Sequence, residues 1–268
     1  MLYEAWKEAR TLLKFWILNL KSAYAYKTSF YMQVIFMMLN NSIWLIAWYM
    51  MFSKFTTIAG FQYPDYLLLW VICCRAFSFV MILWNWCVNK LGDVISQGWV
   101  DTYLLLPGFV LPKIVSRSIE ISAIGDFFFS VILILFIPSV SVVFFVTTLI
   151  VSFLSAIVII GLMIFFQSLS FWIWNSAKLA DAVFQAMIWS ATYPPKIFDT
   201  VFFKVIIVTI LPVYFTSFLP YALVKDFSWM WFGELLLAAA CALTLGTYAF
   251  KKWLRRYESG NAITLNVN

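Results

Sequence analysis

The sequence predicts an all-α integral membrane protein whose 268 residues form one membrane domain (1–268). Apolar residues make up 64% of the chain and charged residues 11%, whereas a soluble domain averages about half and about a quarter. Several apolar runs reach the ~20 residues that a helix needs to cross a bilayer. The chain therefore has room for about six spans and for no large soluble domain.

Residues 1–27 are expected to form an amphipathic helix at the membrane surface. Trp6, Leu13 and other apolar residues recur with helical spacing on one face, while Lys7 and Lys14 fall on another. A basic face opposite an apolar face with aromatic residues is typical of a helix lying on an anionic leaflet. The alternative is a cytosolic helix that packs on another subunit.

Five of the six expected spans are easily placed. They are predicted at roughly 30–52, 65–88, 115–138, 142–166 and 229–250. Only Pro138–Ser141 separates the third span from the fourth, so these two are expected to form a hairpin.

The fifth span is ambiguous between two apolar stretches. Residues 176–193 are barely long enough to cross, and residues 197–220 are interrupted by Lys204, Pro212 and Pro220. Prolines within apolar sequence fit broken helices buried in protein. We therefore favour 176–193 as the span and expect residues 194–226 to form re-entrant half-helices on the extracellular side.

Residues 89–113 are a polar interruption between the second and third spans. A polar stripe recurs at helical spacing in Lys90, Asp93, Gln97 and Asp101. Leu91, Val94 and Ile95 lie on the opposite side, and Gly98 interrupts the pattern before Pro107. This arrangement predicts a short helix along the membrane surface, followed by a bend back into the bilayer. A plain loop is the alternative.

The lysines and arginines predict the orientation. When the N-terminus is placed in the cytosol, 13 of the 18 fall in segments on that side, four fall outside, and Arg75 lies within a span. This is a clear positive-inside bias. Both termini, residues 89–113 and the basic tail 251–268 are therefore predicted to be cytosolic.

No catalytic, cofactor or metal site is expected in this chain. It contains no histidine, and its four cysteines lie in apolar runs, which argues against histidine-based catalysis, zinc ligation and a disulfide framework. It also lacks the Gly-rich phosphate loop with its Lys-Ser/Thr ending that ATPases use. Because the basic residues flank spans, the net charge of +6 is attributed to membrane topology and no nucleic-acid partner is expected.

Arg75 is the most informative charge within the predicted spans. An arginine at mid-bilayer costs ~2.5–3.5 kcal/mol on insertion scales, so it is expected to face protein or water and to find a partner. Asp126 in the third span and Glu234 in the sixth are the candidate partners. An ion pair that fixes helix packing and a substrate or gating contact are the two interpretations.

Three segments carry a resemblance to a known family. They are ISQGWVDTYLLLPGFVLPKIVSRSIEISAIGD (95–126), YPPKIFDTVFFKVIIVTILPVYFTSFLPYAL (193–223) and WLRRYESG (253–260). With these segments the whole chain resembles the permease subunits of ABC-2-type exporters, in particular the short six-span branch that carries no ATPase domain.

The resemblance implies a transport function and its partners. A separate ABC ATPase subunit would bind ATP and Mg²⁺, and a second permease, identical or a sister protein, would complete the path through a bacterial plasma membrane and its lipids. Residues 90–105 would be the coupling helix that docks on the ATPase, beside the connecting helix of 1–27. The side chains expected to transmit its motion are those of Lys90, Asp93, Gln97, Trp99 and Asp101.

A second interpretation comes from a different class of function. The chain would be a membrane assembly or scaffold protein that uses residues 89–113 to dock a cytosolic partner and transports nothing. Loss of export on deletion of the protein, or ATPase activity that depends on it, separates the two. An intramembrane enzyme is disfavoured because no histidine or paired carboxylates are available.

Overall fold

The computed structural model describes residues 2–138, 140–173 and 176–257, with the backbone alone for 2–9, 86 and 87. The described residues are almost all helical. The helices are α1 (Leu2–Ala25), α2 (Lys27–Lys54), α3 (Tyr63–Asn89), α4 (Leu91–Ser96), α5 (Val100–Leu104), α6 (Val110–Val115), α7 (Ser122–Ile134), α8 (Val142–Ser168), α9 (Ser176–Ala191), α10 (Val201–Thr209), α11 (Leu219–Lys225) and α12 (Trp229–Trp253). Short 3₁₀ turns follow α8 and α12 and precede α10, and a π-helical turn, Tyr214–Phe218, leads into α11.

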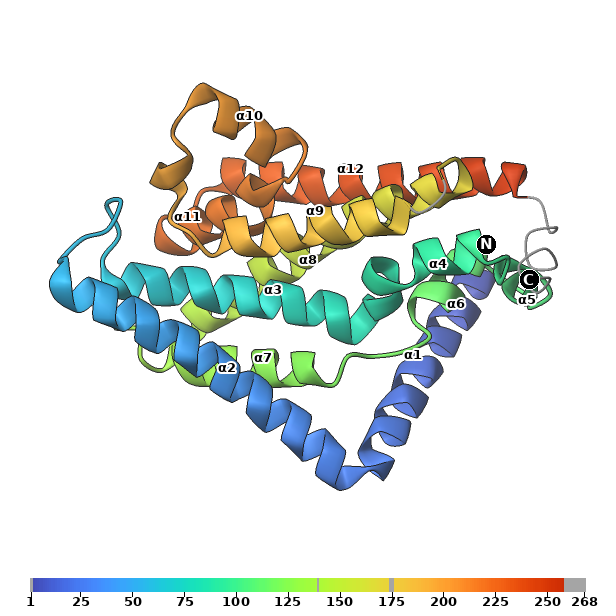
Figure 1. Ribbon diagram of the computed structural model, residues 1–268, viewed down its shortest axis with the longest axis horizontal. Coiled ribbons are helices and arrows are strands. Elements are labelled where there is room, and N and C mark those ends of the chain that lie inside the picture. The colour runs from blue at the N-terminus through green and yellow to red at the C-terminus, as the bar shows by residue number, and fades with distance from the viewer. Residues whose placement is uncertain (1, 139, 174–175, 258–268) are drawn as a thin grey trace, which may run out of the picture.

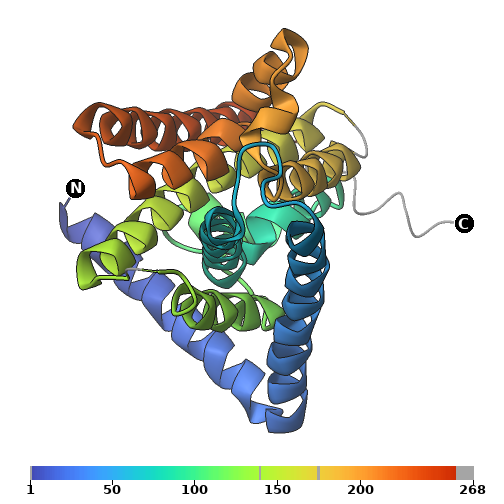
Figure 2. The same cartoon turned by 90° about the vertical axis from the view of Figure 1, so that its left-hand side faces the viewer.

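Helix α3 lies at the centre of the bundle. The end-on view of Figure 2 shows it surrounded by the other long helices, and it packs against α7, α8 and α9. Its side chains from Tyr66 to Cys74 are almost completely buried. The apolar run that predicted the second span therefore forms the core.

Helix α12 covers α8 at very close range. A side-chain carbon on Gly161 would lie 2.3–2.4 Å from the Ala242 carbonyl group, and one on Gly246 would lie 2.2 Å from the Gly161 carbonyl oxygen. Small residues at a crossing let two helix backbones touch, which is a common way for helices to associate in membranes.

Helices α1 and α2 form a V that is open toward the bundle (Figure 1). The helix breaks at Tyr26, and the Trp16 indole and the Asn19 amide attach α1 by donating to the carbonyl oxygens of Leu83 (2.8 Å) and Ser116 (3.0 Å). Leu13 remains more than half exposed. The helix expected over 1–27 is present, and its position on the membrane surface stays a prediction.

Four described helices are long and apolar enough to cross a membrane. They are 27–54, 63–85, 142–171 and 229–256. Helix α7, in the predicted third span, has 13 residues, and α9, in the predicted fifth, has 16, which is about 20 and about 24 Å of helix against a core of ~30 Å. The all-α membrane fold is confirmed, whereas six spans are not established. The third span is shortened because residues 116–121 form no helix.

The segment after α9 is bent as its prolines suggest. Helix α10 and the helical stretch 214–225 meet at 75°, and Pro212 lies in the break. Both arms lie at the end of the molecule that also carries the α2–α3 turn (Figure 1). A bend of this size occurs in a broken span or in a re-entrant loop. That residues 194–226 follow a re-entrant path stays a prediction.

Arg75 is completely buried and pairs with hydroxyl groups. Its guanidinium donates to the Thr148 hydroxyl of α8 (2.8 Å) and to both the hydroxyl (3.2 Å) and the carbonyl oxygen (3.4 Å) of Ser130 on α7. The Phe145 ring lies 5.3 Å from the guanidinium carbon. One cation thus joins three helices in the middle of the bundle.

The prediction that Arg75 forms an ion pair with Asp126 or Glu234 is wrong for the described residues. Asp126 instead accepts a hydrogen bond of 2.5 Å from the Asn41 amide of α2, and Glu234 lies on α12 beside Tyr214. The difference follows from the positions of the two residues on α7. Ser130 lies one turn after Asp126, and it is Ser130 that lies within hydrogen-bonding distance of the guanidinium.

This geometry predicts that replacing the acceptor Thr148 destabilises the protein more than replacing the donor Arg75 does. The Ser130 and Thr148 hydroxyls already donate to carbonyl oxygens of their own helices, so Arg75→Met removes no partner that they need. Thr148→Val leaves a buried cation without its shortest hydrogen bond, which costs about 1–3 kcal/mol. We expect Thr148→Val to lower the midpoint of thermal unfolding in detergent more than Arg75→Met does.

The matched control is Thr244→Val, because Thr244 is exposed and donates only within α12. It should leave the midpoint almost unchanged. A neutral Thr148→Val beside a strongly destabilising Arg75→Met would contradict this account.

Candidate coupling site

The segment between α3 and α7 is a compact cap at one end of the bundle. Helix α3 is kinked at Trp84, which has non-helical angles (φ −142°, ψ 47°), and the chain continues through α4, α5 and α6. Gly98 has φ +77° and separates α4 from α5, a conformation that side chains disfavour. The single coupling helix expected over 90–105 is therefore two short helices.

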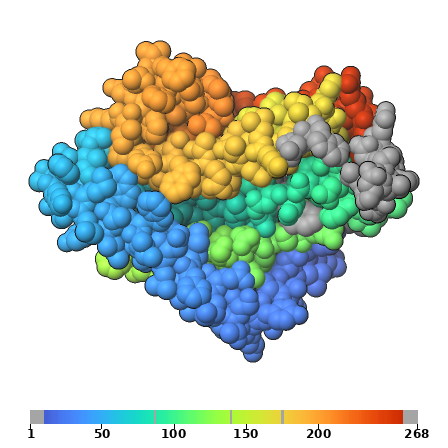
Figure 3. Space-filling view, in the orientation of Figure 1, coloured from blue at the N-terminus to red at the C-terminus, as the bar shows by residue number. Residues whose placement is uncertain are grey.

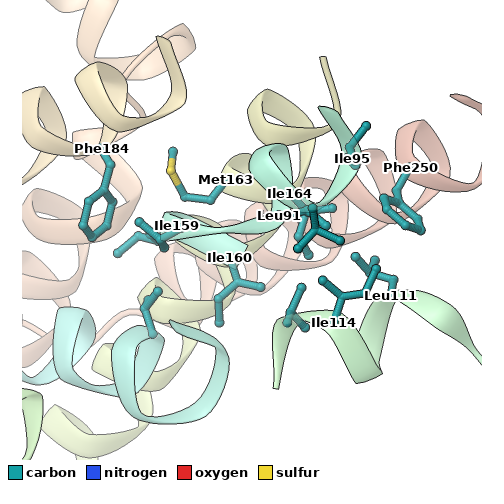
Figure 4. Packing of buried hydrophobic residues seen from close by; sticks show 14 of the residues in the cluster. Leu91, Ile95, Leu111, Ile114, Ile159, Ile160, Met163, Ile164, Phe184 and Phe250 are labelled. Atoms are coloured by element: carbon teal, nitrogen blue, oxygen red, sulfur yellow. The ribbon is translucent and has the colours of Figure 1, made fainter. Parts of the chain in front are cut away.

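The apolar side of the cap is embedded in the bundle. Leu91, Val94 and Ile95 are all buried, as their spacing predicted. Figure 4 shows the converging side chains, among them Leu91 and Ile95 of α4, Leu111 and Ile114 of α6, Ile160 and Ile164 of α8, and Phe250 of α12. The cap is thus continuous with the core of the spanning helices.

Gln167 clamps the cap to the end of α8. Its side chain is fully buried, accepts from the Gly92 N–H (2.8 Å) and donates to the Val88 carbonyl oxygen. It therefore spans the junction of α3 and α4 and satisfies one backbone group on each side. An isolated glutamine in the fourth apolar run was the sequence signal for this contact, and the sequence reasoning missed it.

The chain beyond α12 holds the cap from its other side. The Tyr257 hydroxyl donates to the Gly98 carbonyl oxygen (2.6 Å). Burial, together with the nearby Asp101 carboxylate, raises the pKa of Tyr257 to about 12, so the phenol keeps its proton at neutral pH. The Arg117 guanidinium donates to the Tyr103 hydroxyl (2.6 Å) within the cap. The remainder of the predicted tail, 258–268, lies outside the described residues.

The predicted coupling residues lie mostly on the outer side of the cap. Lys90 and Asp93 form an exposed ion pair (3.7 Å), Gln97 is exposed, and the Trp99 side chain is 53% exposed. Asp101 is half-buried and lies beside Tyr257. The structure therefore leaves four of the five side chains accessible on the cap and pairs Lys90 with Asp93, whereas Asp101 is half-buried.

An exposed apolar tip adjoins these residues. Leu104, Leu105, Leu106 and Phe109 are all exposed, and Leu105 reaches 87%. The sequence interpretation included Leu104 and Leu105 in the expected coupling helix but gave the leucine run no role, because nothing in its spacing separates exposed leucines from buried ones. A segment that exposes both an apolar run and polar side chains has the composition of a protein docking surface.

These features define a class of protein: a multi-pass helical membrane protein with a rigid, partly apolar cap at one end. A family model described as "ABC-2 family transporter protein" matches residues 19–261, so the chain belongs to the ABC-2 transporter family and is a membrane component of a transporter of this kind. No curated protein and no solved structure matches the chain.

The Gln167 clamp predicts a cost for any side chain at Gly92. A methyl group there would lie 2.4 Å from the Gln167 amide oxygen and 2.8 Å from Ala177 and Ser170 side-chain atoms. Gly92→Ala should therefore destabilise the protein by about 1–3 kcal/mol, measured by thermal unfolding in detergent. Gly233→Ala is the control, because nothing lies within 4 Å of the added carbon and the change favours a helix. Equal stability of both variants would contradict the clamp.

The Tyr257 contact predicts a local effect at the cap. Tyr257→Phe removes a hydrogen bond of about 1 kcal/mol, so the backbone amides of residues 97–104 should exchange with solvent about fivefold faster. Hydrogen exchange read by mass spectrometry measures this, with Tyr248→Phe as the control at an exposed tyrosine. Unchanged exchange in this segment would show that the hydroxyl does not hold the cap.

Proposed function

We propose that this chain is the permease subunit of an ATP-driven exporter and that its cap docks on a separate ABC ATPase subunit. The observation that carries the proposal is the exposed apolar tip formed by Leu104, Leu105, Leu106 and Phe109. It lies on the same clamped segment of an ABC-2 family chain as Lys90, Asp93, Gln97 and Trp99. An ATPase subunit with a complementary groove would bury the tip. ATP and Mg²⁺ would be bound by that partner.

Stiffness of the cap supports a role in coupling. A push on the docking surface moves the spanning helices only if the contact does not yield. Gln167 ties the cap to α8, Tyr257 ties it to the chain beyond α12, and the buried face of α4 belongs to the core. Closure of the ATPase dimer would therefore displace α8 and α12 as rigid elements.

The remaining parts of the proposal concern orientation and assembly. The start of α1, the cap and the end of α12 lie at the same end of the molecule (Figure 1), which agrees with a cytosolic location for both termini in a bacterial plasma membrane. A second permease, identical or a sister chain, would complete the path within the lipid. The cargo would leave the cell through the end that carries the bent α10–α11 segment.

The test is co-purification from native membranes in mild detergent, followed by mass spectrometry and an ATPase assay. Leu105→Asp places a charge at the centre of the tip without touching the core, and we expect the co-purified ATPase to fall at least tenfold, about 1.4 kcal/mol. Leu135→Asp is the matched control, because Leu135 is also exposed (75%) but follows α7 at the opposite end.

Each outcome of this experiment separates the exporter from the scaffold interpretation. Retention of the ATPase by the Leu135→Asp variant and its loss by the Leu105→Asp variant support the coupling role. If the wild-type protein brings down no nucleotide-binding subunit and shows no associated ATPase activity, the exporter proposal is abandoned in favour of the scaffold.

A further inference from the structure

A cavity of about 240 Å³ opens between α2, α3 and α9. The space-filling view shows α3 recessed between α2 and α9 on this face (Figure 3). The lining residues that matter here are Asn41, Trp44, Trp48, Asp126, Trp189 and Tyr193. The cavity is smaller than the ~300–1,000 Å³ of closed ligand pockets. It therefore suits one end of a larger amphiphile whose remainder stays outside it.

Among the residues that line this cavity, aromatic rings of α2 contact rings at and just beyond the end of α9. Trp44 and Trp189 meet edge to face at 5.4 Å, and Trp48 and Tyr193 meet at 5.8 Å. Trp44 and Trp189 are partly exposed, so the rings are accessible from outside the bundle. The faces of tryptophan rings attract cations by ~0.5–1 kcal/mol at exposed sites and ~2 when desolvated.

Asp126 supplies the one ionisable carboxyl group among the lining residues. One of its oxygens accepts from Asn41, which is buried and is itself held by the Met37 carbonyl oxygen (3.1 Å) and the Cys74 thiol. None of the ion pairs among the described residues includes Asp126. Arg75, the buried cation of the neighbouring helix α3, is engaged by Ser130 and Thr148 and does not line the cavity.

We propose that this cavity binds the charged end of a lipophilic organic cation, with Asp126 as counter-ion and the tryptophan rings as its walls. An acidic group within a spanning region is costly unless it meets a partner, and an ammonium or phosphonium group among indole faces provides one. The inference rests on the proposed function in one respect: the cavity would hold the cargo on its way through the membrane.

The experiment is equilibrium dialysis of tetraphenylphosphonium against the purified full-length protein in detergent, with protein-free micelles as the blank. We expect saturable binding by the wild-type protein and at least tenfold weaker binding by Asp126→Asn, which keeps an acceptor for Asn41 but removes the charge. Glu234→Gln, a matched change outside the cavity, should bind as the wild type does. Tetraphenylborate, equal in shape and opposite in charge, should not saturate the site.

A second variant tests the aromatic walls. Trp189→Leu, at a half-exposed residue, should weaken binding of the phosphonium severalfold, whereas Trp229→Leu at the exposed start of α12 should not. Size-exclusion profiles confirm that each variant is folded. Binding that is absent in the wild type, or equal in the wild type and Asp126→Asn, overturns the inference and makes Asp126 a packing residue.

The inference and the proposed function fail separately. A protein that co-purifies with an ATPase but binds no tetraphenylphosphonium keeps the exporter assignment and loses the cation site. A protein that binds the cation through Asp126 without any ATPase partner keeps the site and loses the exporter assignment.

Discussion

The main constraint on the architecture is that one buried cation, Arg75, must find its hydrogen-bond acceptors within the protein. Arg75 lies in the middle of the central helix, and its guanidinium reaches hydroxyl groups of α7 and α8. In a lipid core, such a group is tolerated only where its hydrogen bonds are made within the protein. Helices α7 and α8 are therefore held at fixed rotations about α3, and α12 follows because it packs on α8 at the Gly161–Gly246 crossing.

Helix α8 connects this centre with the cap. Thr148 receives the Arg75 hydrogen bond near one end of the helix, and Gln167 grips the Val88–Gly92 junction near the other. The two residues are 19 positions apart, about 28 Å along a helix. One helix thus carries polar contacts both to the central Arg75 and to the junction of α3 with the cap. A displacement of α8 at the cap would therefore also move its contact with Arg75.

The sequence revealed the elements better than their contacts. Composition and apolar runs predicted the membrane class and the long helices, and the spacing of Leu91, Val94 and Ile95 predicted the buried side of the cap. Arg75 was identified as an important residue, but its partner was sought among the carboxylates, because charge is visible in a sequence and the rotation of a helix is not. Ser130 and Thr148 are ordinary residues in apolar runs until the fold places them around the guanidinium.

Two further features, the exposed leucine of the cap and the number of spans, also depend on tertiary structure that a sequence does not display. The coupling role was assigned to the polar stripe of the cap, and the exposure of Leu105 (87%) was not anticipated, since a leucine run has no periodicity that distinguishes core from surface. Six spans were expected from apolar length, whereas four described helices reach the length of a span, because apolar length is not helix length. Ser116–Ile121 and the Pro194–Pro195 break take residues out of the helices on either side, and such interruptions depend on tertiary packing as much as on the residues themselves.

The cavity and the buried cation lie on different faces of α3 but share α7. Asp126 points to Asn41 and the cavity, and Ser130, one turn later on α7, accepts from Arg75. A cation held by Asp126 would pull on the same helix that the guanidinium fixes, and through Arg75 and Thr148 that helix is joined to α8 and so to the cap. Occupancy of the cavity would thus reach the cap through α7, the contacts of Arg75 with Ser130 and Thr148, and α8. Such a linkage would be reciprocal, because an effect of cargo on the cap requires an equal effect of the cap on cargo affinity.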